Sequence, residues 1–566
     1  MVLLRSALLA LALTALLIPA AAAATRPTQP GEDVYGNPNY QVAEETPYCL
    51  TNVCVHWVAA TDDKPADPDG IPLIASGAQH AYEHMASLGW RPPVPDGARG
   101  GGTDLVDIYV KKLNGQSAGV AVRDDDSATQ PSGFVLLAPG FVSQTNGFGQ
   151  RKVAPHEIQH LVEYAYDSYF ESWNAESTSE WAAAQTDGSY DILRISNYVN
   201  AWAEATEFPM VAGYGADGHP PPKAYVDVMW QRWLSDRYGN DMVRDVWERT
   251  AAHAPGAFAP LAIEEALAGR STFFDEFVAS SVAAAEWRAA GSGFAQWDPA
   301  TMPDVERVAT LQPGGDAQAA QLDHTAFALL DVPVGDAQSY ELRATAPSGV
   351  RSAVALVGRR GDGTVDKVVQ ALPSGGEAHL GLADPARYER ITAVLVNADT
   401  AIQEPYRNGF GGWIYAHDDE PYTARIVKAD RPPPPPVDAG SPKVAEPPKE
   451  LPPPVVPPVL DNLVAPHVTL GRLGRGALRR LRAGRPVRLR VSVDERSAVA
   501  ARVVVGNALT VVERRSAARA AGSRTLTLRA TRRARRRLAR VRRAQLVVTA
   551  RDAAGNVRTL RRALRG

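Results

Sequence analysis

The chain of 566 residues has only two cysteines, and beyond its first 24 residues it has no run of about 20 apolar residues. Because a helix that crosses a bilayer needs a run of that length, we expect the mature protein not to span a membrane. Two cysteines without further cysteine or histidine at ligand spacing do not make a thiolate metal site. The composition, 45% hydrophobic and 22% charged, is that of a globular protein. The length indicates about three to four domains.

The first 24 residues have the features of a secretory signal peptide. Arg5 supplies a positive charge, residues 7–18 are apolar, and the alanines at 22–24 offer a cleavage site. We therefore expect a secreted protein, extracellular or associated with the cell wall. In that compartment Cys49 and Cys54, with four residues between them, are expected to form a disulfide that contributes about 2 kcal/mol.

Positive charge is concentrated at the C-terminal end of the chain. Residues 466–566 hold 28 arginines, no lysine and four acidic residues, a net charge of +24, although the whole chain carries only −3. Such a tail suggests an anionic partner, unless its arginines simply form a solvated face. Secretion and the lack of an aromatic stacking motif disfavour nucleic acid. An anionic cell-envelope polymer is therefore the partner that we expect.

The stretch 153–166 contains an H-E-x-x-H motif, from His156 to His160. Its apolar residues recur at helical spacing, so both histidines lie on one face of a predicted helix. Two imidazoles placed in this way can bind one zinc ion, and Glu157 between them can reach a water molecule at the metal. A surface helix with two unrelated histidines would have the same sequence motif, so the residues around the motif must distinguish it from a zinc site.

That context includes a second helical segment, residues 173–181, in which Glu176 and Glu180 are four residues apart. A catalytic zinc needs a third protein ligand and one position open for water. One carboxylate can be that ligand, and the other can accept a hydrogen bond from a ligating imidazole and fix its orientation. Spacing alone favours Glu180, which follows His160 by 20 positions.

The two motifs together resemble those of the gluzincin clan of zinc metallopeptidases, to which thermolysin belongs. The clan pairs H-E-x-x-H with a helix of the form N-x-E-x-x-S-E/D. A closer resemblance is to secreted bacterial metallopeptidase-like proteins whose second motif reads roughly W-x-x-E-A-x-A-x-W, here residues 173–181. This resemblance covers about residues 45–290, including the stretches 88–96, 103–109 and 225–234.

The resemblance implies that His156, His160 and Glu176 ligate zinc and that Glu157 is the catalytic base. In gluzincins the ligating glutamate opens the second motif, and a carboxylate four residues later supports a histidine, which is the place of Glu180 here. Only 15 residues separate His160 from Glu176, a few fewer than in thermolysin-like enzymes. Glu180 therefore remains the alternative ligand.

Two loops suggest further functional residues, one set for stabilising an oxyanion and one for binding calcium. A tyrosine or histidine commonly stabilises the oxyanion in such enzymes, and Tyr214 and His219 lie on a Gly/Pro-rich loop at 213–222. The acidic loop 62–70 offers clustered carboxylates that could hold calcium. A solvated loop without an ion is the alternative.

The sequence predicts a multidomain fold. We expect an α+β zincin-like metallopeptidase domain, a β-sandwich with short alternating strands, a Pro-rich linker and a C-terminal Ig-like β-sandwich. The ending 552–558 resembles bacterial immunoglobulin-like modules of secreted proteins. The expected limits are 1–24 for the signal peptide, 25–47 for a flexible N-terminus, 48–300 for the peptidase domain, 301–430 for the sandwich, 431–465 for the linker and 466–566 for the basic domain.

The function expected from these features is that of a secreted zinc-dependent metalloendopeptidase. Two alternatives stay open. One is a cell-envelope-associated binding or adhesion protein whose metal site is inactive or structural, although a structural site would not need Glu157. The other is a zinc hydrolase that acts on non-peptide amides.

Overall fold

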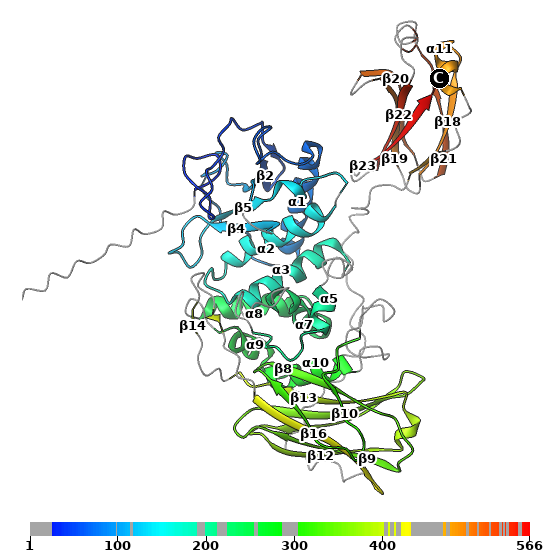
Figure 1. The fold of residues 1–566 in the computed structure, drawn as a ribbon. Coiled ribbons are helices and arrows are strands. Elements are labelled where there is room, and N and C mark those ends of the chain that lie inside the picture. The colour runs from blue at the N-terminus through cyan, green and yellow to red at the C-terminus, as the bar shows by residue number, and fades with distance from the viewer. Residues whose placement is uncertain are drawn as a thin grey trace, which may run out of the picture. The chain divides into compact units, whose positions relative to one another are not determined.

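The structure is a computed structural model. It describes residues 25–97, 99–113, 117–145, 147–189, 198–211, 223–253, 258–285, 304–400, 406–407, 413–414, 420–431, 468–470, 476–493, 497–505, 509–519, 522–530, 535, 538, 543–552 and 557–565. The expected signal peptide and nearly all of the expected Pro-rich linker lie outside these ranges. The chain divides into two compact units, residues 1–448 and 449–566 (Figure 1). Several sheets and two groups of helices make it a multidomain protein, as predicted.

The first unit begins with a five-stranded sheet in the order β1-β2-β3-β5-β4. Strands β2, β3 and β5 are parallel, whereas β1 and β4 are antiparallel to their neighbours. The sheet consists of β1 (Tyr48–Cys49), β2 (Val53–His56), β3 (Val106–Val110), β4 (Gly119–Arg123) and β5 (Gly133–Leu137). The apolar runs at 53–58, 104–111, 119–123 and 133–138 predict the last four of these strands. β3 is buried along its whole length. The sequence of residues 73–89 also predicts a helix, and this helix is α1 (Ile71–Ser87), which packs its apolar side on the sheet.

The H-E-x-x-H stretch forms helix α2 (Ala154–Tyr164), which follows a π-helical turn, η3 (Gly149–Val153). Pro155 is the second residue of α2, so it lies where the winding changes from π-helical to α-helical. Ile158 and Leu161 of α2 enter the same core as the sheet and α1. The opposite side of the helix is thereby left for the histidines.

The second motif forms helix α3 (Ser172–Asp187), which ends at Gly188 in the left-handed conformation, with φ of 67°. This conformation is accessible to glycine at little cost, so Gly188 terminates the helix. The described residues that follow include the helices α5 (Tyr198–Ala203), α6 (Lys223–Val226), α7 (Val228–Tyr238), α8 (Asp241–Ala252) and α9 (Ala259–Leu267). Trp230, Trp233 and Trp247, predicted to be core residues, are buried among them.

The predicted β-sandwich is present as two sheets, with the orders β11-β10-β13-β8-β6 and β12-β9-β16-β7. The strands are β6 (Ala309–Thr310), β7 (Gln318–Leu322), β8 (Ala326–Val332), β9 (Ser339–Ala346), β10 (Ser352–Arg359), β11 (Val365–Leu372), β12 (Gly376–Ala383), β13 (Arg390–Asn397) and β16 (Glu420–Ala429). A short hairpin, β14 (Tyr406–Arg407) with β15 (Trp413–Ile414), lies outside both sheets.

The expected boundary at residue 301 does not separate two cores, because the sandwich and the helices before it share apolar contacts. Side chains of β10 and β13, such as Ala355 and Val394, belong to the same apolar cluster as the helices. Helix α10 (Phe273–Ala285) contacts both of these strands. Because β13 packs on α10 with one face and on the second sheet with the other, its apolar run is almost entirely buried. The helical region and the sandwich therefore share one core within the first unit.

The segment 25–47, expected to be flexible, lies against the five-stranded sheet. Arg26 is 2% exposed and forms ion pairs with Asp96, Asp107 and Asp124. Its guanidinium also stacks over the ring of Phe134. Composition alone suggested a free terminus, but a buried arginine with three carboxylate partners fixes the segment.

The second unit contains two antiparallel sheets around a common core. The three-stranded sheet has β18 in its centre, and the four-stranded sheet has the order β20-β19-β22-β23 (Figure 1). The elements are β17 (Val468–Leu470), α11 (Ala477–Arg482), β18 (Val487–Val493), β19 (Ser497–Val505), β20 (Leu509–Arg519), β21 (Gly522–Leu528), β22 (Arg543–Asp552) and β23 (Val557–Arg565). The predicted strands are confirmed, whereas the immunoglobulin-like class remains a prediction.

Two expectations about the whole chain can be compared with the structure. The disulfide between Cys49 and Cys54 is formed and joins β1 to β2. Among the described residues, no helix has the length and apolar character needed to cross a membrane.

Candidate metal centre

Helices α2 and α3 bring three predicted metal ligands together. The Nε2 atoms of His156 and His160 are 3.1 Å apart. Oε2 of Glu176 lies 3.1 Å from the first of these atoms and 3.4 Å from the second. His156 and His160 are adjacent because four residues correspond to about one helical turn. Glu176 comes from the facing helix, so the packing of α3 on α2 completes the group.

The spacing of these three atoms fits a tetrahedral metal ion. Zinc–nitrogen and zinc–oxygen distances of about 2.0–2.2 Å place neighbouring ligand atoms of a tetrahedral site roughly 3.3 Å apart. The observed separations of 3.1–3.4 Å correspond to one face of such a tetrahedron. Two imidazoles and one carboxylate are also a donor set that zinc prefers. The residues present can therefore hold a zinc ion and leave a fourth position open.

Each histidine is held by another carboxylate at its second ring nitrogen. Oε1 of Glu180 lies 3.0 Å from Nδ1 of His156. Oε2 of Glu163 lies 2.8 Å from Nδ1 of His160. Such contacts fix the ring orientation and keep Nε2 available to a metal. Glu176 thus belongs to the group of three that could hold a metal ion, whereas Glu180 lies at the other nitrogen of His156.

The supporting carboxylates have partners of their own. Glu180 is fully buried and forms an ion pair with Lys152. Glu163 accepts a hydrogen bond of 3.1 Å from the hydroxyl of Ser179 on α3. A buried carboxylate without such partners would be costly. Lys152 and Ser179 therefore stabilise the charges that orient the two histidines.

Glu157 lies in the same buried region, 6% exposed. Burial raises its pKa above the ordinary value for glutamate, which the nearby histidines oppose. Its side chain rests against Gly119 of β4, where an added Cβ would stand 2.8 Å from Cγ and Oε1 of Glu157. A glycine at this position therefore makes room for the carboxylate.

The pKa values of Glu176 and Glu163 are shifted in opposite directions. Burial alone would raise the pKa of Glu176, but its interactions with His160 and His156 lower it well below the usual range. Burial raises the pKa of Glu163 to about 7, although His160 acts in the opposite direction. Glu176 is therefore the carboxylate of the pair that stays ionised most readily, as a metal ligand must.

Aromatic rings enclose the two histidines. The ring of His156 stacks with Tyr225 of α6, at 5.9 Å between centroids. The ring of His160 stacks with Phe170, at 6.4 Å. These rings shield the imidazoles and limit their rotation.

Sequence reasoning missed four of these neighbours, Lys152, Glu163, Ser179 and Tyr225. Glu163 could have been found from the sequence, because a carboxylate three residues after His160 lies on the same face of the helix. Lys152 and Ser179 act across the interface between helices, which no spacing rule reveals. The predicted oxyanion stabilisers, Tyr214 and His219, lie outside the described residues.

The acidic loop 62–70 uses its carboxylates for protein contacts. Asp62 pairs with Lys112 at 2.7 Å, and Asp63 pairs with Lys111 at 3.1 Å. Asp67 accepts a hydrogen bond from the backbone N–H of Asp69. Within the described residues this loop contributes no group of three ligands for a metal ion. Calcium binding by this loop therefore stays a prediction.

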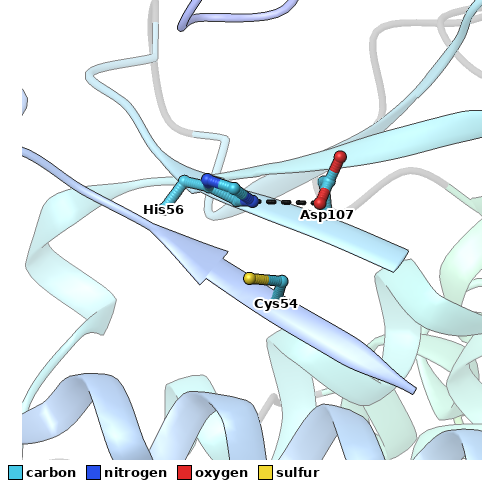
Figure 2. A group of neighbouring side chains, drawn as sticks. All are labelled: Cys54, His56 and Asp107. Atoms are coloured by element: carbon cyan, nitrogen blue, oxygen red, sulfur yellow. Dashed lines mark hydrogen bonds and ion pairs between the residues drawn. The ribbon is translucent and has the colours of Figure 1, made fainter. Parts of the chain in front are cut away.

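Cys54, His56 and Asp107 form a second group of potential ligands (Figure 2). The sulfur of Cys54 is bonded to Cys49, so it offers no thiolate. His56 contacts Asp107 at 2.9 Å through Nε2 and Glu44 at 2.5 Å through Nδ1, so both ring nitrogens are engaged. Burial alone would lower the pKa of His56, but these two carboxylates raise it to about 9. The group is a buried ionic network that includes Arg26, and it does not fit a metal site.

Comparisons with known proteins give no family for this chain. No protein-family model matches, and no curated protein matches. Among solved structures, a β-glucuronidase from Ruminococcus gnavus aligns with 42% of this chain and 35% of its own, at 11% identity and a TM-score of 0.11. A bacterial ice-binding adhesin of 1.5 MDa aligns with 40% of this chain and 57% of its own, at 12% identity and a TM-score of 0.12.

The chain thus spans about a third of the glucuronidase and little more than half of the adhesin. Alignments with such low TM-scores carry no argument about fold or function. The function must be argued from the site itself.

Proposed function

We propose that this protein is a secreted zinc-dependent metalloendopeptidase of the gluzincin type. The observation that supports the proposal best is the convergence of Nε2 of His156, Nε2 of His160 and Oε2 of Glu176 at 3.1–3.4 Å from one another. Each imidazole has a carboxylate at its other nitrogen, as ligating histidines usually do. The signal-peptide features of residues 1–24 and the disulfide support secretion.

A bound zinc ion supplies Lewis acidity, which activates a water molecule and polarises a carbonyl group. Glu157 would accept a proton from the water molecule that attacks the scissile carbonyl, and would later give the proton to the leaving amine. Its raised pKa suits this role, because a base that must also act as an acid works best when its pKa lies near the working pH.

A peptide is the substrate that the surroundings of Glu157 suit best. β4 is an edge strand of the five-stranded sheet, and it passes beside Glu157 at Gly119. An extended chain can add to the edge of a sheet through main-chain hydrogen bonds, whatever its side chains are. A substrate bound there would place its backbone carbonyls beside the catalytic base.

The proposal can be tested with the protein from Thr25 onward. It should cleave casein and members of a peptide library, lose this activity with a chelator and regain it with added zinc. A protein that binds zinc at one equivalent but cleaves no peptide would indicate a structural metal site. Cleavage that persists in a metal-free protein would exclude the mechanism.

A further inference from the structure

The outward face of the three-stranded sheet in the second unit is lined by arginines and hydroxyl groups. Along β18, Val487, Leu489 and Val491 are buried in the core, whereas Arg488 and Arg490 between them are exposed. Successive side chains of a strand point to opposite faces, so the two arginines share the outer face. They lie roughly 6.8 Å apart along the strand.

Strand pairing places hydroxyl groups beside these arginines. Arg488 is opposite Thr527 and Arg490 is opposite Thr525 in the register of β18 with β21. Ser492 is opposite Ser523, and their hydroxyl oxygens are 2.5 Å apart. We call these residues the arginine–hydroxyl face, and it consists of Arg488, Arg490, Ser492, Ser523, Thr525 and Thr527.

Within the described residues of the second unit, the arginines of this face have no acidic partner. Further exposed arginines belong to the same unit, among them these four: Arg479 and Arg480 of α11, Arg485 and Arg529. In the described part of the unit, none of these four and neither Arg488 nor Arg490 forms an ion pair. Glu513 and Asp552 belong to β20 and β22 of the other sheet. Like charges on adjacent positions repel, so a bound anion would stabilise this face.

The chemistry of the face specifies oxyanions. A guanidinium donates two parallel hydrogen bonds to a phosphate or carboxylate group, and neighbouring hydroxyls can donate to the same group. Residues 466–566 contain 28 arginines and no lysine, which favours this bidentate mode. Residues 468–566 contain no tryptophan, tyrosine, phenylalanine or histidine, so the two sheets of the unit offer no ring on which a base could stack.

We propose that the arginine–hydroxyl face binds a linear polymer that carries phosphate or carboxylate groups and no bases. Repeated oxyanions along the polymer would meet the row of Arg488 and Arg490 in succession. The inference concerns the second unit alone and does not depend on peptidase activity.

The test uses the full-length protein and four probes, namely inorganic polyphosphate, polygalacturonate, neutral dextran and a mixed-sequence single-stranded DNA. The variant Arg488→Gln/Arg490→Gln should bind polyphosphate or polygalacturonate at least about tenfold more weakly than the wild type at fixed salt. Because each lost phosphate contact reduces the salt slope by about one, the slope on polyphosphate should fall by roughly two.

A matched control is Arg425→Gln/Arg431→Gln, which removes the same charge from exposed positions of the first unit. It should bind like the wild type. Arg488→Lys/Arg490→Lys keeps the charge but loses the bidentate geometry, and it should bind with intermediate strength. Loss of binding to polyphosphate alone or to polygalacturonate alone identifies which oxyanion is recognised.

Three results would overturn the proposal. The first is equal affinity of the wild type and the Arg488→Gln/Arg490→Gln variant for both polyanions. The second is equal loss of affinity in the control variant, which would show only a general charge effect. The third is tighter binding of the DNA than of either polymer through the same two arginines.

Discussion

Oε1 of Glu180 lies 3.0 Å from Nδ1 of His156, on the side of the ring away from the other histidine. Nε2 of the same ring lies 3.1 Å from Oε2 of Glu176. One imidazole thus contacts both carboxylates that the sequence offered as third ligand, each at a different nitrogen. Of the two carboxylates only Glu176 also contacts His160, and this contact is why we propose Glu176 as the ligand and Glu180 as the residue that orients His156.

The first prediction compares Glu176→Ala with Glu180→Ala. Loss of Glu176 removes a ligand, so zinc should not be retained. Loss of Glu180 removes the support of His156, and zinc affinity or activity should fall by roughly 10–100-fold. Zinc content after dialysis and peptidase activity, measured side by side, distinguish the two. A metal-free Glu180→Ala beside a metal-loaded Glu176→Ala would reverse the assignment.

The second prediction concerns Lys152, which pairs with the fully buried Glu180. Lys152→Met leaves that carboxylate without its cation, and breaking a buried pair in this way costs about 3–5 kcal/mol. Urea denaturation of the metal-free protein should show the loss. The double variant Lys152→Met/Glu180→Gln removes both charges and should recover most of the stability. If the single variant is as stable as the wild type, the pair does not hold Glu180.

The third prediction concerns the space that Gly119 leaves for Glu157. Gly119→Ala places a Cβ 2.8 Å from Cγ and Oε1 of Glu157, so the carboxylate must move. Activity should fall by about tenfold or more, as small misplacements of a catalytic group cause, while zinc content stays unchanged. Gly140→Ala is the matched control, because its Cβ would meet no atom within 4 Å. Equal activity of both variants would show that Glu157 is not positioned by Gly119.

The fourth prediction is a pH dependence of stability that arises from His56. Its pKa is raised from 6.5 to about 9, because its contacts with Asp107 and Glu44 outweigh the effect of burial. A raised folded-state pKa means that the protonated ring stabilises the folded state. This contribution is complete below pH 6.5 and is lost as the pH rises through about 9.

Urea midpoints of the wild type and of His56→Gln, measured from about pH 6 to pH 10, provide the test. The advantage of the wild type should be constant at the acidic end and shrink between the two pKa values. A difference between the two proteins that does not change over this range would contradict the assignment.

The sequence predicted the parts of the fold that depend on local patterns. The apolar residues of 119–123 and 326–332 predict strands with these limits, and β4 and β8 have them, because the apolar pattern ends at polar or glycine-containing turns. The two histidines could be placed together because they are four residues apart on one helix. Glu176 could be assigned only through a resemblance, since its position depends on how α3 packs on α2.

Contacts between distant residues could not be predicted in the same way. Arg26 looked like part of a polar terminus, yet its three carboxylate partners lie 70, 81 and 98 positions away along the chain. The common core of α10 and β13 also joins segments whose apolar patterns are consistent with separate domains. Burial on both faces of a strand reflects its neighbours, which a local pattern does not identify.

The central claim is that Glu157 acts as the base on a water molecule at a zinc ion held by His156, His160 and Glu176. The measurement that tests it most directly is the zinc content and peptide hydrolysis of Glu157→Gln, compared with the wild type. Glutamine keeps the size of the side chain but cannot accept the proton. The account predicts one zinc per chain in both proteins and a rate that falls by roughly 10²–10⁴-fold in the variant. Full activity in a zinc-loaded Glu157→Gln protein would contradict it.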